Sequence, residues 1–302
     1  MSKPNDIISQ MGKIIECVPN FSEGRNQEVI DTIFDAAKRI KNVKVFGLEY
    51  NPDHNRMLFT IVGSPADVLD SVFESIKEAT ELIDMTKHKG EHPRIGATDV
   101  VPFVPISNVS MKECIELSEN LAKKVADELK IPVYLYEESA KKPEYKNLAD
   151  IRVGEFEGLK DDFKPADFGP SFVHPTAGAM VTGARKYLIA FNVNLDTGDV
   201  QIAKDIASKI REKGGGLPGV KALGFDVDGL AQVSMNLVDF EKTSFDEAYR
   251  EVEKEAAARG VSIKSSEIYG MIPIEALVRS VRTTFKADTF KSDQILENKI
   301  YE

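Results

Sequence analysis

The chain has 302 residues, of which 42% are hydrophobic and 29% are charged, as in a globular protein with one large core or two modest ones. Its net charge of -10 disfavours non-specific binding to nucleic acid, because such binding requires a basic surface that neutralises phosphates. No run approaches the roughly eighteen apolar residues of a membrane span, and the polar N-terminus, Met1 to Gly12, lacks the apolar core of a secretion signal. We therefore expect a soluble cytoplasmic protein without a membrane or nucleic-acid partner.

The first half of the chain alternates strand and helix signals. Strands are predicted at 14–18, 43–49, 57–62, 100–106 and 131–136. Helices are predicted after the N-cap residue Asn26, after Ser64-Pro65, and from the capping box at Ser110 to Lys130, each with apolar residues at helical spacing. The region 137–168 is rich in charged residues and proline, which predicts a surface connection carrying one short helix.

The second half begins the pattern again. A strand is predicted at 186–195, then a helix to Lys213, a hairpin of 220–227 and 231–240 around Asp228-Gly229, a helix ending near Gly260, and a strand within 262–272. This βαββαβ order is that of a ferredoxin-like unit, and the first half follows a similar order with extra elements. We predict an α/β (α+β) fold with two such subdomains, residues 1–178 and 179–302, and a substrate cleft between them.

The segment Lys87 to Asp99 concentrates the reactive residue types, including His88 and His92. His88 to His92 has the form H-x-x-E-H, in which two histidines on one helical face hold zinc. Gly90 within the motif and Pro93 after it disfavour that helix, so we predict no metal site. The segment leads into an apolar strand, which favours a functional loop over a merely solvated one. From these residues alone the two histidines are equal candidates for a base, and a structural role is the alternative for each.

Other chemical signals are weaker. Cys17 and Cys114 occupy apolar positions without metal spacing, so we expect reduced, buried thiols. The glycines 214–216 follow a helix and match no nucleotide-binding pattern. The chain is acidic, so an anionic small molecule would require a local group of positive side chains, for which Lys87, Lys89, Arg94, Arg185 and Lys186 are available.

Four stretches together resemble the glutamate formimidoyltransferase family. They are Ile15 to Gly24, Asp84 to Arg94, Asp167 to Ser171 and Gly183 to Asn192, and the resemblance extends over nearly the whole chain. It implies transfer of a formimino group from N-formimino-L-glutamate to N5 of tetrahydrofolate during histidine degradation, by a homodimer that uses no metal. Animal members are usually fused to a cyclodeaminase, whereas this sequence ends at Glu302, so we expect the stand-alone transferase.

The resemblance also implies roles for individual residues. His92 matches the family's catalytic histidine, and an imidazole with a pKa near 6.5 suits proton transfer at neutral pH. Glu49 aligns with an acid, usually aspartate, that would hold the cationic formimino group; a solvated carboxylate at a strand end is the alternative. Arg56, Arg94, Arg185 and Lys186 are candidates for binding glutamate carboxylates, and a surface ion pair is the alternative for each.

The folate-contacting segment of the family matches Gly169, Pro170, Ser171, Phe172, Val173, His174, Pro175, Thr176, Ala177 and Gly178. The amide of Asn20 could contact the pterin or glutamate, or stabilise a local turn. Two other functions remain open. One is a folate-dependent enzyme with another one-carbon donor, such as 5-formyltetrahydrofolate, and the other is a folate-binding protein without turnover.

Overall fold

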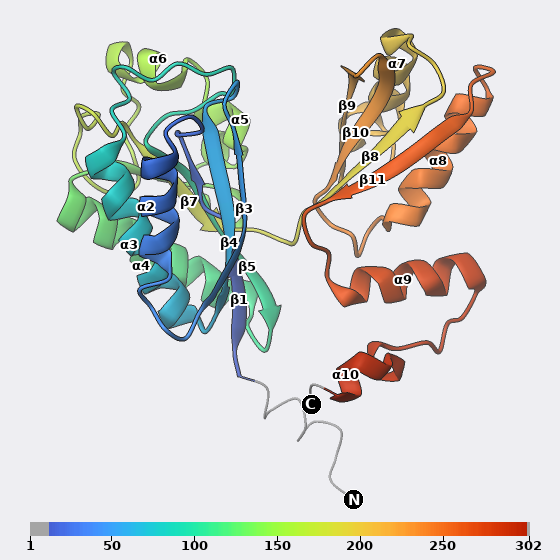
Figure 1. Ribbon diagram of the computed structural model, residues 1–302, viewed down its shortest axis with the longest axis horizontal. Coiled ribbons are helices and arrows are strands. Elements are labelled where there is room, and N and C mark those ends of the chain that lie inside the picture. The colour runs from blue at the N-terminus through green and yellow to red at the C-terminus, as the bar shows by residue number, and fades with distance from the viewer. Residues whose placement is uncertain (1–11, 301–302) are drawn as a thin grey trace, which may run out of the picture. The chain divides into compact units, whose positions relative to one another are not determined.

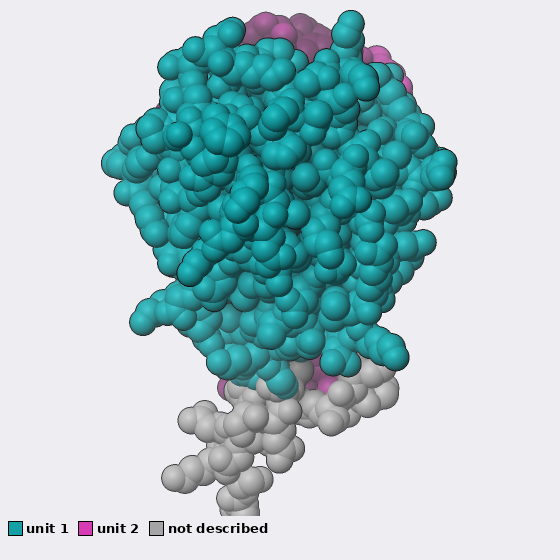
Figure 2. All heavy atoms as spheres, turned by 90° about the vertical axis from the view of Figure 1, so that its left-hand side faces the viewer, with its two compact units in different colours: residues 1–185 teal, residues 186–302 magenta. Residues whose placement is uncertain are grey.

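The computed structural model describes residues 12–300 and divides the chain into two compact units, Met1–Arg185 and Lys186–Glu302 (Figures 1 and 2). The N-terminal residues 1–11, where the sequence predicts no secretion signal, lie outside the described residues. Both units combine helices with one sheet, so the predicted fold class is confirmed. Among residues 12–300, no helix is both long and apolar enough to cross a bilayer.

Unit 1 contains a mixed seven-stranded sheet. Its strands are β1 (Ile14–Cys17), β2 (Asn20–Phe21), β3 (Lys44–Asn51), β4 (Arg56–Gly63), β5 (Thr98–Ser107), β6 (Val133–Leu135) and β7 (Met180–Ala184). The order is β1-β4-β2-β5-β7-β6, with β3 paired to β4 and β1 also paired to β5. β7 lies parallel to β5 and β6, and all other pairs are antiparallel. The strands β1, β3, β4 and β5 with two helices form the predicted βαββαβ unit, and the later elements extend it.

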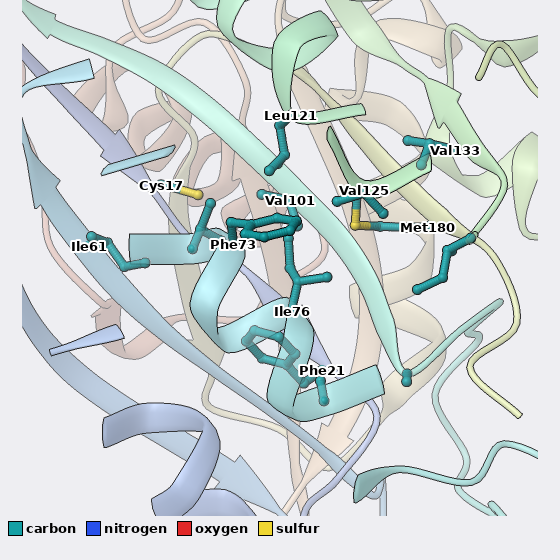
Figure 3. Packing of buried hydrophobic residues seen from close by; sticks show 14 of the residues in the cluster. Cys17, Phe21, Ile61, Phe73, Ile76, Val101, Leu121, Val125, Val133 and Met180 are labelled. Atoms are coloured by element: carbon teal, nitrogen blue, oxygen red, sulfur yellow. The ribbon is translucent and has the colours of Figure 1, made fainter. Parts of the chain in front are cut away.

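Three amphipathic helices form the core of unit 1 with this sheet. They are α2 (Gln27–Ala37), α3 (Pro65–Leu82) and α4 (Met111–Leu129). Each begins at a predicted cap, namely Asn26, Ser64 and Ser110, whose side-chain oxygens accept hydrogen bonds from the first turn. Figure 3 shows apolar side chains of α3 and α4 packed with Val101 of β5 and Met180 of β7. Their burial removes apolar surface from water, which is the main favourable term in folding.

The connection after β6 is more ordered than its charged sequence predicts. It contains two 3₁₀ turns, Glu137–Ser139 and Pro143–Tyr145, and two short helices, α5 (Leu148–Ile151) and α6 (Glu155–Asp161), rather than one helix. Scattered apolar residues account for the difference, because Tyr145, Ile151 and Leu159 are all buried in a second small core. This core holds the backbone on either side of Arg152, which lies between α5 and α6.

Unit 2 has the ferredoxin-like order predicted for the second half. Its strands are β8 (Ile189–Leu195), β9 (Val220–Val227), β10 (Leu230–Leu237) and β11 (Ile263–Tyr269), and its helices are α7 (Val200–Ile210), α8 (Phe245–Ala257), α9 (Ile274–Phe285) and α10 (Leu296–Ile300). The sheet order β11-β8-β10-β9 is antiparallel throughout. Asp228 and Gly229 turn the β9–β10 hairpin with φ of 52° and 78°, which suits Asp-Gly. α7 ends at Ile210, three residues before the predicted end at Lys213, because Glu212–Gly214 forms a separate 3₁₀ turn.

The boundary between the units follows Arg185, whereas the sequence predicts it after Gly178. β7 accounts for the difference, since its residues 180–184 pair with β5 and β6 in the first sheet. The two cysteines lie in unit 1 as free, buried thiols, as predicted.

Candidate active site

The register of three strands brings polar residues to one end of the unit 1 sheet. Phe21 at the end of β2 lies opposite Met57 of β4 and Thr98 of β5. Residues next to these positions therefore surround one small pocket, which is lined by Phe21, Ser22, His54, Asn55, Arg56, His88, His92, Arg94 and Asp99. The cavity measures about 10 Å³, close to the space for a single water molecule. A substrate would therefore enter this site only as the side chains move.

The loop that carries the two histidines packs directly on the β3–β4 hairpin. The side chain of Asn55 accepts a hydrogen bond from Gly24 N at 2.9 Å and donates one to Lys89 O at 3.1 Å. Asn55 has a φ of 47°, a left-handed conformation that asparagine tolerates. A Cβ at Gly90 would lie 2.3 Å from His54 O. Gly90 is thus required by this close approach of two backbones.

The structure distinguishes the two histidines by their hydrogen bonds. His88 is buried, and Arg94 Nε donates to its Nδ1 at 3.1 Å. Guanidinium is never an acceptor, so Nδ1 has the lone pair and Nε2 has the proton, which it donates to Asn55 O at 3.0 Å. Both ring nitrogens of His88 are therefore occupied, as in a structural histidine. Burial lowers the pKa of His88, which keeps the ring neutral.

His92 has the opposite arrangement. Its Nδ1 lies 2.7 Å from the carbonyl oxygen of Pro93, and a carbonyl only accepts, so the proton is at Nδ1 and the lone pair is at Nε2. Nη1 of Arg56 lies against the same ring, 2.7 Å from Nδ1 and in contact with Nε2. Because Nδ1 has the proton, the guanidinium donates to Nε2. Burial, followed by the positive charges of Arg56 and Arg152, lowers the pKa of His92 to about 4. At neutral pH this imidazole is uncharged, and its lone pair at Nε2 can take a proton once the guanidinium of Arg56 moves away from it.

Arg56 and Arg94 have different partners. Arg56 donates from Nε to the side chain of Asn20 at 3.0 Å, while Asn20 itself donates to Val18 O at 2.8 Å, so Asn20 has a turn role as well as a site contact. Burial lowers the pKa of Arg56 to about 10, which still leaves it charged at pH 7. Arg94 is buried and paired with Glu157 at 2.7 Å, and with Glu155. Its charge is thus already offset by carboxylates of the protein.

The H-x-x-E-H segment is not helical, so His88 and His92 do not share a helical face. In the described part of the chain, no group of three or more histidine, cysteine, aspartate or glutamate side chains is arranged to hold a metal ion. The two histidines thus lack the helical arrangement that the zinc-peptidase motif requires.

Comparison with known proteins identifies the family. Residues 14–185 match the model of the formiminotransferase domain, N-terminal subdomain, and residues 190–299 match that of the formiminotransferase domain. The chain belongs to the formiminotransferase family. It is 46% identical to a glutamate formimidoyltransferase of Streptococcus pyogenes serotype M1 over 96% of this chain and 99% of that protein. It is 44% identical to a glutamate formimidoyltransferase of Thermoplasma acidophilum over 95% of this chain and 97% of that protein.

Animal members of the formiminotransferase family are longer. The formimidoyltransferase-cyclodeaminase of Rattus norvegicus is 44% identical over 89% of this chain, and the match covers 52% of that protein. The resemblance stated from the sequence motifs is therefore confirmed, including the match to the two glutamate formimidoyltransferases along nearly their whole length.

The family-implied residues do not all lie in the pocket. His92, Arg56 and Arg94 line it, and Asn20 contacts Arg56. Glu49 is exposed on β3 and does not line it. Because Asn51 lies opposite Arg56 and Glu49 lies opposite Leu58, Glu49 is a diagonal neighbour of Arg56 on the same face of the sheet.

Arg185 and Lys186 also lie outside the pocket lining. Lys186 forms an ion pair with Asp239 at 2.7 Å within unit 2. Arg185 follows β7, and its backbone N–H donates to Phe103 O at 3.0 Å. The charge of Lys186 is thus already paired within unit 2.

The segment 169–178 lies beside the histidine loop. Thr176 O accepts from Met85 N at 2.8 Å, and Ala177 O accepts from Ala97 N at 2.9 Å. His174 and Gly178 close a turn through two backbone hydrogen bonds of 3.0 and 3.1 Å. These bonds anchor the segment at its end, while Phe172, which is 58% exposed, remains open to solvent.

Several residues of the site were not identified from the sequence, and Asp99 and Arg152 are two of them. Asp99 is buried at the start of β5, where it accepts from Ile95 N at 3.0 Å and forms an ion pair with Arg152. Asp99 could have been suspected, because an acid at the start of an apolar strand needs a partner. Arg152 follows α5 in the charged connection, where no sequence pattern separates it from solvated residues.

Proposed function

We propose that this protein is a glutamate formimidoyltransferase, which transfers the formimino group of N-formimino-L-glutamate to N5 of tetrahydrofolate. The observation that carries the proposal is a neutral His92 with its lone pair at Nε2, in a chain that belongs to the formiminotransferase family. Tetrahydrofolate is then a co-substrate, and the reaction requires no metal. We further propose a cytoplasmic homodimer that acts in histidine degradation.

In the proposed reaction His92 acts first as a general base and then as a general acid. N5 of tetrahydrofolate attacks the formimino carbon, forms the new C–N bond and gives a tetrahedral carbon. His92 Nε2 takes the proton that N5 releases. The imidazolium then returns this proton to the glutamate nitrogen as the old C–N bond breaks with its electron pair, so glutamate leaves and the ring is again neutral. General acid–base catalysis of this kind typically contributes about 10² to 10⁴-fold.

The remaining family-implied residues have proposed binding roles. Residues 169–178 would contact folate, with the exposed ring of Phe172 offering a surface for a planar pterin. Glu49 would stabilise the protonated formimino group from the face of the sheet that it shares with Arg56. Arg56, Arg185 and Lys186 would bind carboxylates, as would Arg94 once its pairs with glutamates rearrange, and Asn20 would position Arg56.

The test is glutamate release by purified protein that is supplied with N-formimino-L-glutamate and tetrahydrofolate. The His92→Ala variant is compared with Arg39→Gln, a surface control that follows the C-terminal end of α2 and whose guanidinium pairs with Glu74 and Glu78. Release that depends on tetrahydrofolate, and that falls about 10² to 10⁴-fold only in His92→Ala, supports the proposal.

Two outcomes would replace this function with the alternatives. Release of the one-carbon group from another donor, such as 5-formyltetrahydrofolate, without activity on N-formimino-L-glutamate would indicate a different folate-dependent enzyme. Binding of tetrahydrofolate with no turnover of either donor would indicate a folate-binding protein.

A further inference from the structure

The positive charges around His92 are not equally paired. Arg94 bonds to Glu155 and Glu157. Arg152 pairs with Asp99. In the described residues, no carboxylate forms a hydrogen bond or ion pair with Arg56, which contacts only the amide of Asn20 and the ring of His92. Arg56 is half-buried, so its guanidinium is partly removed from water without a carboxylate as counter-charge, and a bound ligand could supply one.

Arg152, which pairs with Asp99 of the pocket, has an unsatisfied donor. Its side chain is 12% exposed, and one terminal nitrogen bonds to Asp99. Its Nε is buried and has no hydrogen-bond partner among residues 12–300. Buried donors are almost always paired in proteins, so an unpaired one marks a position where a partner is missing. Arg152 is tied to the pocket through this ion pair, because Asp99 lines the same pocket as Arg56 and His92.

We propose that Arg56 and Arg152 together bind one carboxylate of the formimino donor beside His92. This inference rests on the proposed function and names the residues that would select a donor with a glutamate part. Guanidinium matches a carboxylate with two parallel hydrogen bonds, and such charge-assisted bonds are about twice as strong as neutral ones. A carboxylate at this position would satisfy the free Nε of Arg152 and supply the missing counter-charge of Arg56.

Carboxylate binding would also make His92 available as a base. In the free protein a guanidinium nitrogen of Arg56 contacts Nε2, the atom that must take the proton from the attacking amine. A carboxylate that draws Arg56 toward itself vacates that lone pair. The donor would thus prepare its own general base, and a compound with a formimino group but no carboxylate would not.

The pKa of His92 reports this event. The groups that act on its ring are Arg56 from β4, Arg152 after α5 and Asp99 from β5. The ring of His54 from the β3–β4 hairpin lies 6.1 Å away between centroids, and His88 and Arg94 line the same pocket. Among these, the two guanidiniums lower the pKa of His92, and Asp99 raises it. An added carboxylate has the same sign as Asp99, so its binding should raise the pKa from about 4 toward the usual value near 6.5.

The experiment is a histidine NMR titration, which is tractable because the chain has four histidines. His92 is assigned by its absence in His92→Gln, and glutamate is the carboxylate probe. We expect saturating glutamate to raise the pKa of His92 by about one unit or more in the wild type and in Arg39→Gln. In Arg56→Gln and Arg152→Gln we expect the pKa to be higher without glutamate and to change little with it.

Steady-state kinetics supply the second readout. We expect each glutamine variant to raise KM for N-formimino-L-glutamate about 10- to 100-fold, in proportion to the loss of a charged hydrogen bond, with KM for tetrahydrofolate changed much less. Arg152→Lys, which keeps the charge but loses the free Nε, should lie between wild type and Arg152→Gln. Melting curves identify any variant that loses its fold, and Arg56→Gln tests the pair independently of the Arg152–Asp99 contact.

The outcomes separate this inference from the proposed function. Glutamate that binds without moving the pKa of His92, or an Arg152→Gln variant with unchanged KM and an unchanged shift, would overturn the carboxylate pair even if the transferase reaction is observed. A glutamate-dependent shift that requires both arginines would support the pair even if no formimino transfer is found, in which case the proposed function alone fails.

Discussion

Gly96→Ala should destabilise unit 1 and disrupt the pocket at the same time. Gly96 precedes β5, bridges to Gly178, and accepts a hydrogen bond from Ser22 Oγ at 2.7 Å. A Cβ at this position would lie 2.0 Å from Ala179 O and 2.7 Å from Ala177 O. Both obstacles are backbone atoms, so no rotamer change removes the overlap, and the two segments must separate by about 1 Å.

The expected cost is about 3 kcal/mol, the upper part of the usual range for overpacking. For a unit of this size, 1 kcal/mol corresponds to about 2–4 °C in Tm, so the unfolding transition of unit 1 should fall by roughly 6–12 °C. Activity should fall as well, because Ser22 lines the pocket and its hydroxyl bonds to Gly96 O.

Differential scanning calorimetry of Gly96→Ala beside Gly158→Ala measures this cost. Gly158 lies within α6, and a Cβ there would meet no atom within 4 Å, so alanine should leave Tm unchanged or raise it slightly. A Gly96→Ala protein that melts within about 1 °C of the wild type would refute the close packing from which the magnitude is calculated.

Three further predictions concern burial and charge. The pKa of His92 is lower in the folded state than in the unfolded state, so the unfolded state binds the proton first as the pH falls. His92 therefore reduces the free energy of unfolding as the pH falls from about 6.5 to about 4. In urea unfolding, His92→Gln should lose less stability than the wild type between pH 7 and pH 4.5. Arg94→Ala should destabilise the protein more than Glu157→Gln in the same assay, because Arg94 is buried whereas Glu157 is 61% exposed and its half of the pair is screened by solvent; equal costs would contradict this reasoning. Burial raises the pKa of Cys17 and of Cys114, the latter to about 12. Neither thiol should therefore react with Ellman's reagent at pH 8 until denaturant is added. Rapid labelling of the native protein would contradict this prediction.

Much of the fold was predictable because its signals are local. Helix starts at Asn26, Ser64 and Ser110 follow from side chains that accept hydrogen bonds from the first turn. The Asp228-Gly229 turn follows from residues that tolerate positive φ. The connection between β6 and β7 was not predictable, because its buried residues, such as Tyr145 and Ile151, lack a periodic spacing and are buried only by contacts distant in sequence.

The candidate site was predictable to a lesser degree. The sequence identified the segment that contains His88 and His92, but it could not choose between them without the family resemblance. The choice depends on tautomers, since Arg94 occupies one nitrogen of His88 whereas Pro93 leaves Nε2 of His92 with a lone pair. Such hydrogen bonds depend on how loops pack in the tertiary structure, which a local sequence motif does not determine.

The sequence by itself determined the βαββαβ order of unit 2, the helix caps, the reactive segment and the family, because each of these depends on neighbouring residues or on long matched stretches. Only the tertiary structure decided which charges meet. Arg56, Asp99 and Arg152 lie on three elements distant in the chain, and they come together because β2, β4 and β5 share one register while a small apolar core holds α5. Electrostatic interactions depend on distance in space, and that distance is a property of the packed sheet and not of the sequence pattern.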